Sequence, residues 1–419
     1  MITTQPNCND INETGLLPLN EALARIMAAV PQIDGYERIT IEKARGRSLA
    51  EAITAGFNVP GHTNSAIDGY ALASADLPTE GTRLFEIAGK AFAGEPFLGG
   101  IKPGQCLRIM TGAQMPEELD TVIMQEHVEI QDNAIRIDSR HKPGQNVRKA
   151  GEDISQGQTI LHPGKFLTPP DIGLIASLGI PEISVTRQLR IAIASTGNEI
   201  YSIGTVPGTA GLYDSNRYSL WAALDRPDIE VINLGILEDR PEALLNAFER
   251  AGQFADVIIS TGGVSVGEAD YTKTALADSG HIDFWKVAIK PGRPLAFGQI
   301  GKAVFFGLPG NPVAVMITFY LIVLPALEKM VGIKSKPIAP VFRARTLENL
   351  RKKPGRTEVP RGIVEQDQNG EWTVRSTGKQ GSGILSSMSL ANAFIILDHD
   401  RASVKAGEWV WVKPFAGMF

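Results

Sequence analysis

The sequence predicts a multi-domain protein of the α/β plus β class, in which a central doubly wound α/β domain is flanked by two β-rich regions. The chain has 419 residues, and at the usual ~100–200 residues per domain it should contain about two to four domains. Between residues 189 and 335, apolar strand-like runs alternate with helix-like segments, a pattern typical of parallel sheets with crossover helices. The flanking regions instead contain short strand candidates separated by glycine and proline turns.

The α/β region is expected to begin with LRIAIAS, a continuous apolar run typical of a strand buried on both faces. Further strands are predicted at EVINLGI, DVIIS, FWKVAI and AVFFGL. Helices are predicted at NRYSLWAAL after the cap pair Asp214-Ser215, at RPEALLNAFERAG, at ADYTKTALADSG and from about Pro312. Strands separated by helices predict a mostly parallel sheet covered on both faces. Ligands bind such sheets at the carboxyl ends of the strands, so the candidate sites follow Ser195, Ser260 and Leu308.

The domain boundaries follow changes in these patterns. The expected parts are a flexible tail (1–15), an N-terminal helix and linking segment (16–56), a small β-rich domain (57–154), a second linking segment (155–188), the α/β domain (189–335) and a C-terminal β domain (336–419). In the small β-rich domain, strands are predicted at RLFEIAG, CLRIM, TVIMQ and AIRID. In the C-terminal domain they are predicted at VFRAR, TEVPRGIV, EWTVRS, AFIIL and EWVWVK.

The bulk composition argues against several classes of function. Lys and Arg number 41 against 46 Asp and Glu, and the net charge of -5 does not favour a nucleic-acid binder. Cys8 and Cys106 lie far apart and form no metal-ligand pattern, which fits a reducing compartment. The N-terminus shows no secretory signal, and the longest apolar stretch, Val313–Leu327, is shorter than a membrane span and contains Pro325. We therefore expect a cytoplasmic protein without nucleic-acid or membrane partners.

The strongest local motif is STGGVSVGEAD, directly after the predicted strand DVIIS. Gly262 and Gly263 allow the backbone to approach a ligand closely, and the N–H groups around Ser265 and the following helix favour an anion. Glu268 and Asp270 end the loop, and carboxylates there suit Mg²⁺ or an oriented water. The alternative is a tight strand-to-helix turn in which Asp270 acts only as a cap.

The same segment contains a G-x-S-x-G pattern, which is also the nucleophile elbow of α/β-hydrolases. Thr261 and Gly262 separate the serine from the strand, no oxyanion partner motif is present, and His281 and His399 have no supporting context. The pattern therefore does not favour a hydrolase.

The segment WKVAIKPGRPLAFG gathers Lys286, Lys290 and Arg293 near the end of a predicted strand, around a turn at Pro291. Such cations suit phosphate or another oxyanion, although lysines also protect exposed edge strands. In the following LPGNP segment, Pro309 and Pro312 predict a rigid turn before a helix.

Outside the α/β region, the motif NSAIDGYA contains Asp68 and RIMTGAQMP contains Thr111. By themselves, both residues are more typical of ordinary turn chemistry than of a site. In the last domain, the segments PGRTEVPRG and TGKQGSG contain Arg356, Arg361, Lys379 and Ser382. These residues fit either a further phosphate contact or the ordinary surface of a hairpin.

Together these segments resemble the molybdopterin molybdenumtransferase family, the MoeA-type enzymes, whose relatives include the C-terminal domain of gephyrin. The resemblance rests on NSAIDGYA, RIMTGAQMP, KAGEDI, STGNEI, STGGVSVGEADYTK, WKVAIKPGRPLAFG, GLPGNPVAV and TGKQGSG, in this order across nearly the whole chain. It implies elongated homodimers of four-domain subunits, with a molybdopterin-binding α/β domain and a C-terminal β barrel. It also implies an active cleft between the α/β domain of one subunit and the NSAIDGYA-bearing domain of the other.

The activity implied by this resemblance is insertion of molybdate into the dithiolene of adenylylated molybdopterin, with release of AMP and a requirement for Mg²⁺. Asp270, Glu199 and Asp239 would position Mg²⁺ or the attacking water.

The resemblance also implies how the anions are bound. Cationic donors match phosphate and molybdate, which are both tetrahedral oxyanions. The residues expected to hold them are Lys286, Lys290, Arg361 and Ser382. Asp68, Thr111 and Asp153 would complete the cleft across the dimer. The remaining predicted substrate contacts are Gly262, Gly263, Ser265, Pro291, Arg293, Pro309 and Pro312.

Two rival functions fit parts of the sequence. One is the adenylyltransferase that makes the adenylylated substrate, or a nucleotide pyrophosphatase of related fold; the other is a non-catalytic scaffold that binds a partner peptide. The additional β domains and the NSAIDGYA motif favour the insertion step. Under that interpretation the expected partners are adenylylated molybdopterin, molybdate, a second copy of the chain, the adenylyltransferase and recipient molybdoenzymes.

Overall fold

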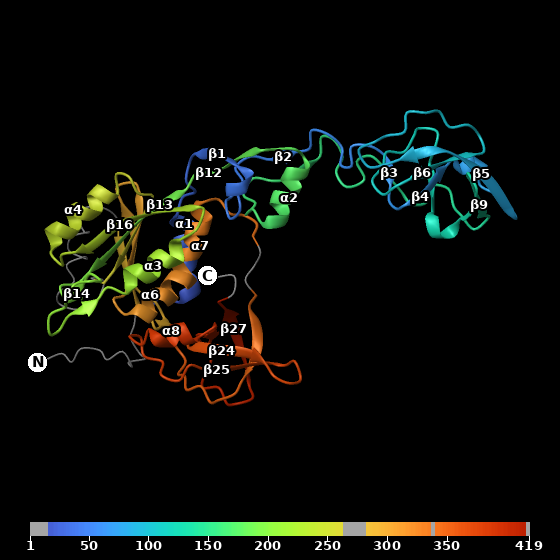
Figure 1. Cartoon of the computed structure of the whole chain (residues 1–419). Coiled ribbons are helices and arrows are strands. Elements are labelled where there is room, and N and C mark those ends of the chain that lie inside the picture. Colours follow the sequence, from blue (N-terminus) through green and yellow to red (C-terminus); the bar gives the residue numbers. More distant parts are fainter. Residues whose placement is uncertain (1–15, 263–281, 337–339, 416–419) are drawn as a thin grey trace, which may run out of the picture. The chain divides into compact units, whose positions relative to one another are not determined.

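The computed structural model describes residues 16–262, 282–336 and 340–415 and divides the chain into two compact units (Figure 1). The larger unit comprises Met1–Ala50, Gly164–Thr168 and Ser184–Phe419, and the smaller unit comprises Glu51–Pro163 and Pro169–Ile183. The predicted tail (1–15) and the predicted helix ADYTKTALADSG lie outside the described residues.

The larger unit contains a six-stranded sheet in the order β16-β13-β17-β21-β20-β18. Its strands are β13 (Leu189–Thr196), β16 (Ile229–Leu237), β17 (Val257–Thr261), β18 (Ile282–Lys286), β20 (Pro294–Ile300) and β21 (Ala303–Leu308). The first four strands in the spatial order are parallel, whereas β20 and β18 are antiparallel additions at one edge. The predicted α/β class is therefore confirmed. The strand at PLAFGQI was not predicted, and FWKVAI forms two short strands, β18 and β19 (Ile289–Lys290), instead of one.

Helices cover both faces of this sheet, because successive residues of a strand point to opposite faces. Ile191 and Ile193 pack in the cluster that includes α1 (Leu19–Ala29), α3 (Asn216–Leu224) and the helical segment from Pro312 to Met330. Ala192 and Ala194 pack in a second cluster with α4 (Pro241–Ala251). The predicted covering on both faces is confirmed.

The apolar stretch after Pro312 is a core helix of three consecutive parts, α6 (Pro312–Thr318), the π-helical η4 (Phe319–Val323) and α7 (Leu324–Met330). By length and composition alone this helix would span a membrane, but 72% of its most apolar window is buried inside the protein. Its apolar surface is therefore used for packing against the sheet.

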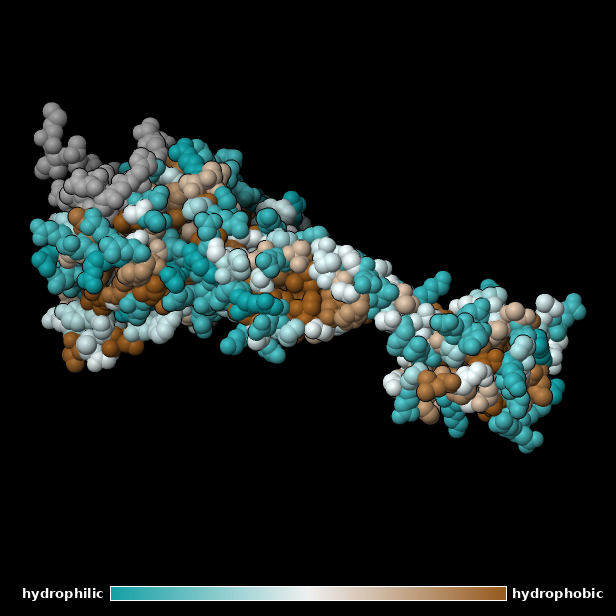
Figure 2. Space-filling view, turned by 90° about the horizontal axis from the view of Figure 1, so that it is seen from above, coloured by the Kyte–Doolittle hydropathy of each residue, from teal (hydrophilic) through white to brown (hydrophobic). Residues whose placement is uncertain are grey.

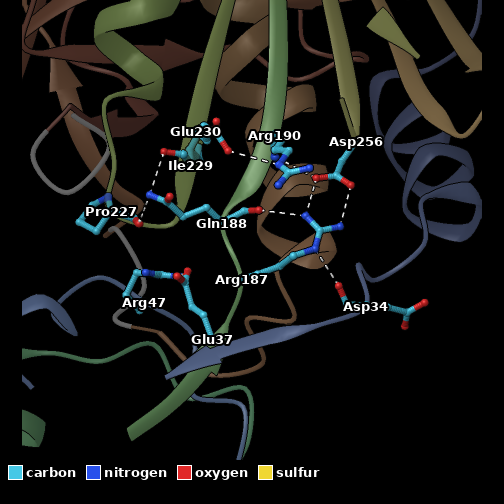
Figure 3. Close-up of polar contacts among 10 residues, drawn as sticks. All are labelled: Asp34, Glu37, Arg47, Arg187, Gln188, Arg190, Pro227, Ile229, Glu230 and Asp256. Atoms are coloured by element: carbon cyan, nitrogen blue, oxygen red, sulfur yellow. Dashed lines mark hydrogen bonds and ion pairs between the residues drawn. The ribbon is translucent and has the colours of Figure 1, made fainter. Parts of the chain in front are cut away.

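A polar cluster joins the amino ends of β13 and β17 (Figure 3). The carboxyl ends of these strands lie at the opposite edge of the sheet. Arg187 donates two hydrogen bonds to the carboxylate of Asp256, at 2.7 and 2.8 Å, and a third to the carbonyl of Asp34 at 2.8 Å. The Asp256 carboxylate also accepts the backbone N–H of Arg190 at 2.9 Å. These contacts hold the start of β13 against the neighbouring strand and the N-terminal segment, which is a structural role.

The C-terminal region of the larger unit contains a closed barrel in the order β22-β25-β24-β26-β27. Its strands are β22 (Phe342–Thr346), β24 (Arg361–Gln366), β25 (Trp372–Ser376), β26 (Ala393–Ile396) and β27 (Trp409–Pro414), accompanied by α8 (Ser386–Leu390). Inward side chains such as Val374, Ile395 and Val412 form its core. The barrel implied by the family resemblance is confirmed. A short strand between the barrel strands β22 and β24, β23 (Thr357–Glu358), is not part of the barrel and pairs in parallel with β19.

The smaller unit is built on a six-stranded sheet in the order β7-β4-β6-β5-β9-β8. Its strands are β4 (Gly69–Leu72), β5 (Thr82–Ala91), β6 (Gln105–Ile109), β7 (Thr121–Met124), β8 (Glu129–Gln131) and β9 (Ala134–Asp138). The pairs β3 (Asn64–Ser65) with β10 (Val147–Arg148) and β2 (Ile53–Thr54) with β11 (Thr159–Leu161), together with α2 (Pro169–Ser177), complete it. All four predicted strands of this region are present.

The other described elements are short. They are β1 (Tyr36–Thr40), β12 (Glu182–Thr186), β14 (Ile200–Tyr201), β15 (Leu212–Tyr213) and the 3₁₀ turns η1 (Ile41–Lys43), η2 (Ser74–Asp76) and η3 (Gln125–His127). On the face drawn in Figure 2, hydrophilic side chains dominate and hydrophobic ones gather in separate patches.

Candidate active site

The strand order reverses between β13 and β17, because the chain passes from β13 to β16 on one side and then to β17 on the other. Crevices at such reversals are the usual ligand sites of doubly wound sheets. Here the carboxyl ends carry Thr196, Gly262 and Leu308. The N–H of Gly262 donates to the carbonyl of Leu308 at 3.1 Å. Gly262 has φ +84°, and a Cβ there would lie 2.4 Å from the carbonyl oxygen of Thr196, so only glycine fits.

A buried polar network lies beneath this crevice and was not predicted. The Ser195 hydroxyl donates to Asp214 at 2.8 Å, and the Arg217 guanidinium donates to Asp214 and to Asn233 at 2.8 Å each. Asp214 also accepts the N–H of Arg217 at 3.2 Å, so the predicted helix cap is present, but it comes from Asp214 and not from Ser215. Ser195 and Asn233 lie on separate strands and reach Asp214 and Arg217 only through folding, so no local sequence pattern could have grouped all four residues.

The LPGNP turn and the TGKQGSG segment meet at the start of α6. Asn311 precedes the helix but forms no side-chain cap, and the N–H of Val313 instead donates to the carbonyl of Ser382 at 3.0 Å. The side chain of Asn216 donates to the carbonyl of Gly310 at 2.7 Å and so ties the turn to α3. A Cβ on Gly310 would lie 3.8 Å from the Cα of Gly262.

These contacts bring several predicted residues close to one another. Those at the crevice are Gly262, Pro309, Pro312 and Ser382.

A pocket of about 360 Å³ lies where the β19 turn meets the barrel. Its lining includes the predicted residues Lys290, Pro291 and Arg361. The full lining is Lys290, Pro291, Glu348, Asn349, Leu350, Arg351, Glu358, Val359, Pro360, Arg361, Ser376, Gly378, Gln380 and Leu397. Three of these side chains are cationic and two are anionic, so the pocket is polar with an excess of positive charge.

Arg361 is almost fully buried, and burial lowers the pKa of its guanidinium to about 10. At neutral pH it therefore remains a cation. Within the described part of the chain its hydrogen-bond partners are uncharged: the Ser387 hydroxyl at 2.9 Å and the carbonyls of Gln380 and Gly381 at 3.2 and 3.0 Å. Arg361 thus orders the TGKQGSG segment, and no carboxylate among the described residues pairs with its positive charge at the pocket wall.

Lys286 and Arg293 do not line this pocket. Lys286 ends β18 opposite Pro294, and its carbonyl accepts the N–H of Leu17 at 2.8 Å. Arg293 lines a much smaller cavity beside Val287 and Arg356. The three cations that are clustered in the sequence are therefore distributed over separate places.

Two of the three predicted metal ligands are described, and they are electrostatically coupled. Burial, and secondarily the charge of Glu199, raise the pKa of Asp239. One carboxylate oxygen of Asp239 is buried and has no hydrogen-bond partner among the described residues. This donor set fits Mg²⁺, because a divalent cation would relieve both the repulsion and the missing contact. Among the residues with described positions no group of three potential ligands occurs; Asp270, Gly263 and Ser265 lie outside them.

In the smaller unit, the Asp68 carboxylate accepts two hydrogen bonds from Thr111, from the backbone N–H and from the hydroxyl, both at 2.8 Å. These bonds, the backbone one first, lower the pKa of Asp68. Asp153 is exposed, and its backbone N–H donates to the carbonyl of Val59 at 3.1 Å. Asp68 and Thr111 thus form one ordered anionic feature.

Comparisons with known proteins cover nearly the whole chain. Three family descriptions match: the MoeA N-terminal region (domain I and II) at residues 17–179, a probable molybdopterin binding domain at 192–329 and the MoeA C-terminal region (domain IV) at 343–415. A molybdopterin molybdenumtransferase from Haemophilus influenzae is 42% identical, covering 96% of this chain and 99% of the relative. A gephyrin from Dictyostelium discoideum is 32% identical, covering 94% of this chain and 62% of the relative.

Solved structures agree with these matches. A molybdopterin biosynthesis MoeA protein from Pyrococcus horikoshii OT3 has a TM-score of 0.83 and 28% identity, covering 95% of this chain and 100% of that one. The fold defines a multi-domain α/β protein with a glycine turn at the carboxyl ends of its parallel strands, where doubly wound sheets usually bind ligands. The chain belongs to the MoeA-type molybdopterin molybdenumtransferase family. The predicted family resemblance is confirmed.

Proposed function

We propose that this protein is the enzyme that inserts molybdate into adenylylated molybdopterin, with release of AMP. Its membership of the molybdenumtransferase family supports a role in molybdenum cofactor biosynthesis and the transfer of molybdenum. The observation that carries the finer proposal is the pair of features within the larger unit: a glycine-lined strand-end crevice, and a neighbouring cationic pocket that share the TGKQGSG segment.

The crevice suits the pyrophosphate of the substrate. Only glycine fits the turn after β17, because a Cβ at Gly262 would lie 2.4 Å from the carbonyl oxygen of Thr196. The position of this turn at the carboxyl ends of the parallel strands supports anion binding there. The network around Asp214 fixes the elements below, so the crevice keeps its shape when a charged ligand enters.

The cationic pocket suits molybdate. Lys290 contributes a half-exposed ammonium to the pocket. The buried Arg361 contributes a second positive charge, and its hydrogen bonds to the TGKQGSG segment hold it in place. Both charges offset the repulsion between the oxyanion and the anionic substrate. Lys286 and Ser382 do not line this pocket, and they are proposed to contact the substrate outside it, Ser382 beside the start of α6.

Glu199 and Asp239 are the described residues that would hold Mg²⁺, with Asp270 as a further proposed ligand. When bound, the metal would neutralise charge on the pyrophosphate. In the reaction, the oxygen of water bonds to one phosphorus, the bridging P–O bond breaks and the protons of water pass to the phosphate products, so AMP and the phosphate of molybdopterin separate. The two dithiolene sulfurs bond to molybdenum while one molybdate oxygen leaves as water with the thiol protons.

We further propose that the protein is a cytoplasmic homodimer, in which Asp68, Thr111 and Asp153 of one subunit serve the site of the other. The ordered Asp68–Thr111 pair supports a functional role for this segment.

The test is to incubate the protein with adenylylated molybdopterin, Mg²⁺ and molybdate and to measure AMP. We expect molybdate-dependent AMP release and formation of molybdenum cofactor, which activates a recipient apoenzyme. AMP release without any molybdenum incorporation would support the pyrophosphatase alternative. Binding of the substrate without AMP release would support the scaffold alternative, and either result contradicts the proposal.

A further inference from the structure

Glu358 is a buried carboxylate in the wall of the cationic pocket, with only 8% of the residue exposed. It lies on β23 directly beside Lys290 in the parallel β19–β23 register. The backbone fixes this pairing, because Val359 donates to the carbonyl of Lys290 at 2.9 Å and Thr357 donates to that of Ala288 at 2.8 Å. Register partners in neighbouring strands point to the same face, so Lys290 and Glu358 project together.

The carboxylate of Glu358 is shared between two cations. One oxygen lies 3.4 Å from the Lys290 ammonium and the other lies 3.6 Å from the Arg356 guanidinium. The side chain of Lys290 is 49% exposed, whereas that of Glu358 is only 10% exposed. The lysine is therefore the movable partner, and the carboxylate is the fixed one. A lysine side chain that has no fixed partner loses considerable rotamer freedom when it binds a ligand.

A carboxylate in an oxyanion pocket has an electrostatic cost. Glu348 and Glu358 both line the pocket, and each opposes the entry of an anion. Glu348 has a separate structural task, since its carboxylate accepts the backbone N–H of Ser376. Glu358 instead contacts Lys290, the cation that would bind the oxyanion. Its effect on Lys290 must therefore favour anion binding by more than the negative charge of Glu358 opposes it.

We infer that Glu358 is a positioning residue that holds the Lys290 ammonium at the wall of the pocket, ready to receive a tetrahedral oxyanion. This inference rests on the proposed function of the pocket. Glu358 does not touch the anion; it acts by restricting Lys290 before binding, which lowers the entropy lost on binding. The pairing also joins the α/β domain to the barrel, so the cation is fixed relative to Arg361.

The test compares Glu358→Gln with Glu348→Gln, which removes an equal charge from the same pocket without touching Lys290. Molybdate affinity is measured by equilibrium dialysis of the full chain, and KM for molybdate and kcat are measured by AMP release. We expect Glu358→Gln to weaken molybdate binding about tenfold and to raise KM for molybdate more than it lowers kcat. Glu348→Gln should bind molybdate as tightly as the parent or more tightly.

A double-mutant cycle separates positioning from a general loss of structure. In a Lys290→Met background, Glu358→Gln should cause no further loss of molybdate affinity, because its effect passes through the lysine. Glu358→Asp, which keeps the charge, should recover part of the loss. Circular dichroism and thermal unfolding confirm that each variant is folded.

The outcomes distinguish this inference from the proposed function. If the parent protein binds no molybdate, the function proposed for the pocket is wrong. If the parent binds molybdate and Glu358→Gln binds it equally well or better, the positioning role is wrong while the pocket remains. A further loss from Glu358→Gln in the Lys290→Met background also contradicts the positioning role.

Discussion

Among individual residues, Asp239, a proposed metal ligand, has an environment that costs the folded protein stability. Burial and the neighbouring Glu199 raise its pKa, so the ionised carboxylate is less favourable in the folded chain than in the unfolded chain. This destabilisation is complete above the raised pKa of the folded state. It disappears as the pH falls below the ordinary aspartate value, where both states are protonated.

We therefore expect Asp239→Asn to raise the melting temperature of the metal-free protein at pH 7.5, by about 1 °C or more. The same variant should bind Mg²⁺ at least about tenfold more weakly, because it loses a charged ligand. The gain in melting temperature should shrink toward pH 4.5. Thermal unfolding at both pH values and calorimetric titration with Mg²⁺ measure these effects. A variant that is less stable than the parent at pH 7.5 would contradict this account.

The pKa of Asp68 depends on two donors from one residue, and they can be separated. Thr111→Val removes the hydroxyl donor and keeps the backbone N–H, which is the larger cause of the lowered pKa. We expect the pKa of Asp68 to rise but to stay below its ordinary value. Carboxylate titration by NMR with labelled aspartate measures it, and Thr111→Ser, which keeps both donors, is the control. An unchanged pKa in Thr111→Val would show that the hydroxyl bond is absent in solution.

At the element scale, the turn after β17 depends on the absence of a side chain. Gly262→Ala combines a positive φ with a Cβ that would lie 2.4 Å from the Thr196 carbonyl. We expect a loss of about 1–3 kcal/mol in the free energy of unfolding, together with loss of AMP release, because the strand-end crevice must distort. Denaturant unfolding and the AMP assay measure the two effects.

Gly370→Ala is the matched control for this prediction. Gly370 has φ +80°, nearly the same as Gly262, but nothing lies within 4 Å of a Cβ there. This variant should show only the smaller cost of the backbone conformation and should keep its activity. Equal destabilisation by the two substitutions would mean that the contact with Thr196 is unimportant.

At the scale of the whole molecule, the proposed homodimer has a measurable consequence. Light scattering should give about twice the chain mass of 45.1 kDa. If each site takes Asp68 from one subunit and Lys290 from the other, mixed dimers of Asp68→Ala and Lys290→Ala chains contain one intact site. Co-expression of these two inactive variants should then restore about a quarter of the parent activity, since half of the dimers are mixed. No recovery in isolated mixed dimers would contradict sites shared between subunits.

Much of the fold follows from local patterns in the sequence. The run LRIAIAS predicted a strand buried on both faces, and alternate residues of β13 do pack into two separate clusters. The helix NRYSLWAAL has the predicted residues, because a strong polar cap precedes it. The strand at PLAFGQI escaped prediction because a proline begins it and a glycine interrupts it, and both residues weaken a strand pattern.

The candidate site was only partly predictable. The sequence identified the glycine at position 262, and the structure shows the close contact that requires it. It also grouped Lys290 with Arg293, which are neighbours in the chain but line different cavities. Arg361, which was expected to hold the anion, lines the pocket, and its guanidinium also donates to backbone carbonyls of the TGKQGSG segment.

Local sequence patterns were enough to predict most of the strands, the burial of β13 on both faces and the positions of several glycine and proline turns. These properties depend on neighbours within a few positions along the chain. Three contacts became visible only in the folded chain: Lys290 with Glu358, the carbonyl of Ser382 with the N–H of Val313, and Ser195 with Asp214. Such contacts join residues brought together by packing of distant segments, and the energy of each depends on burial that local sequence does not specify.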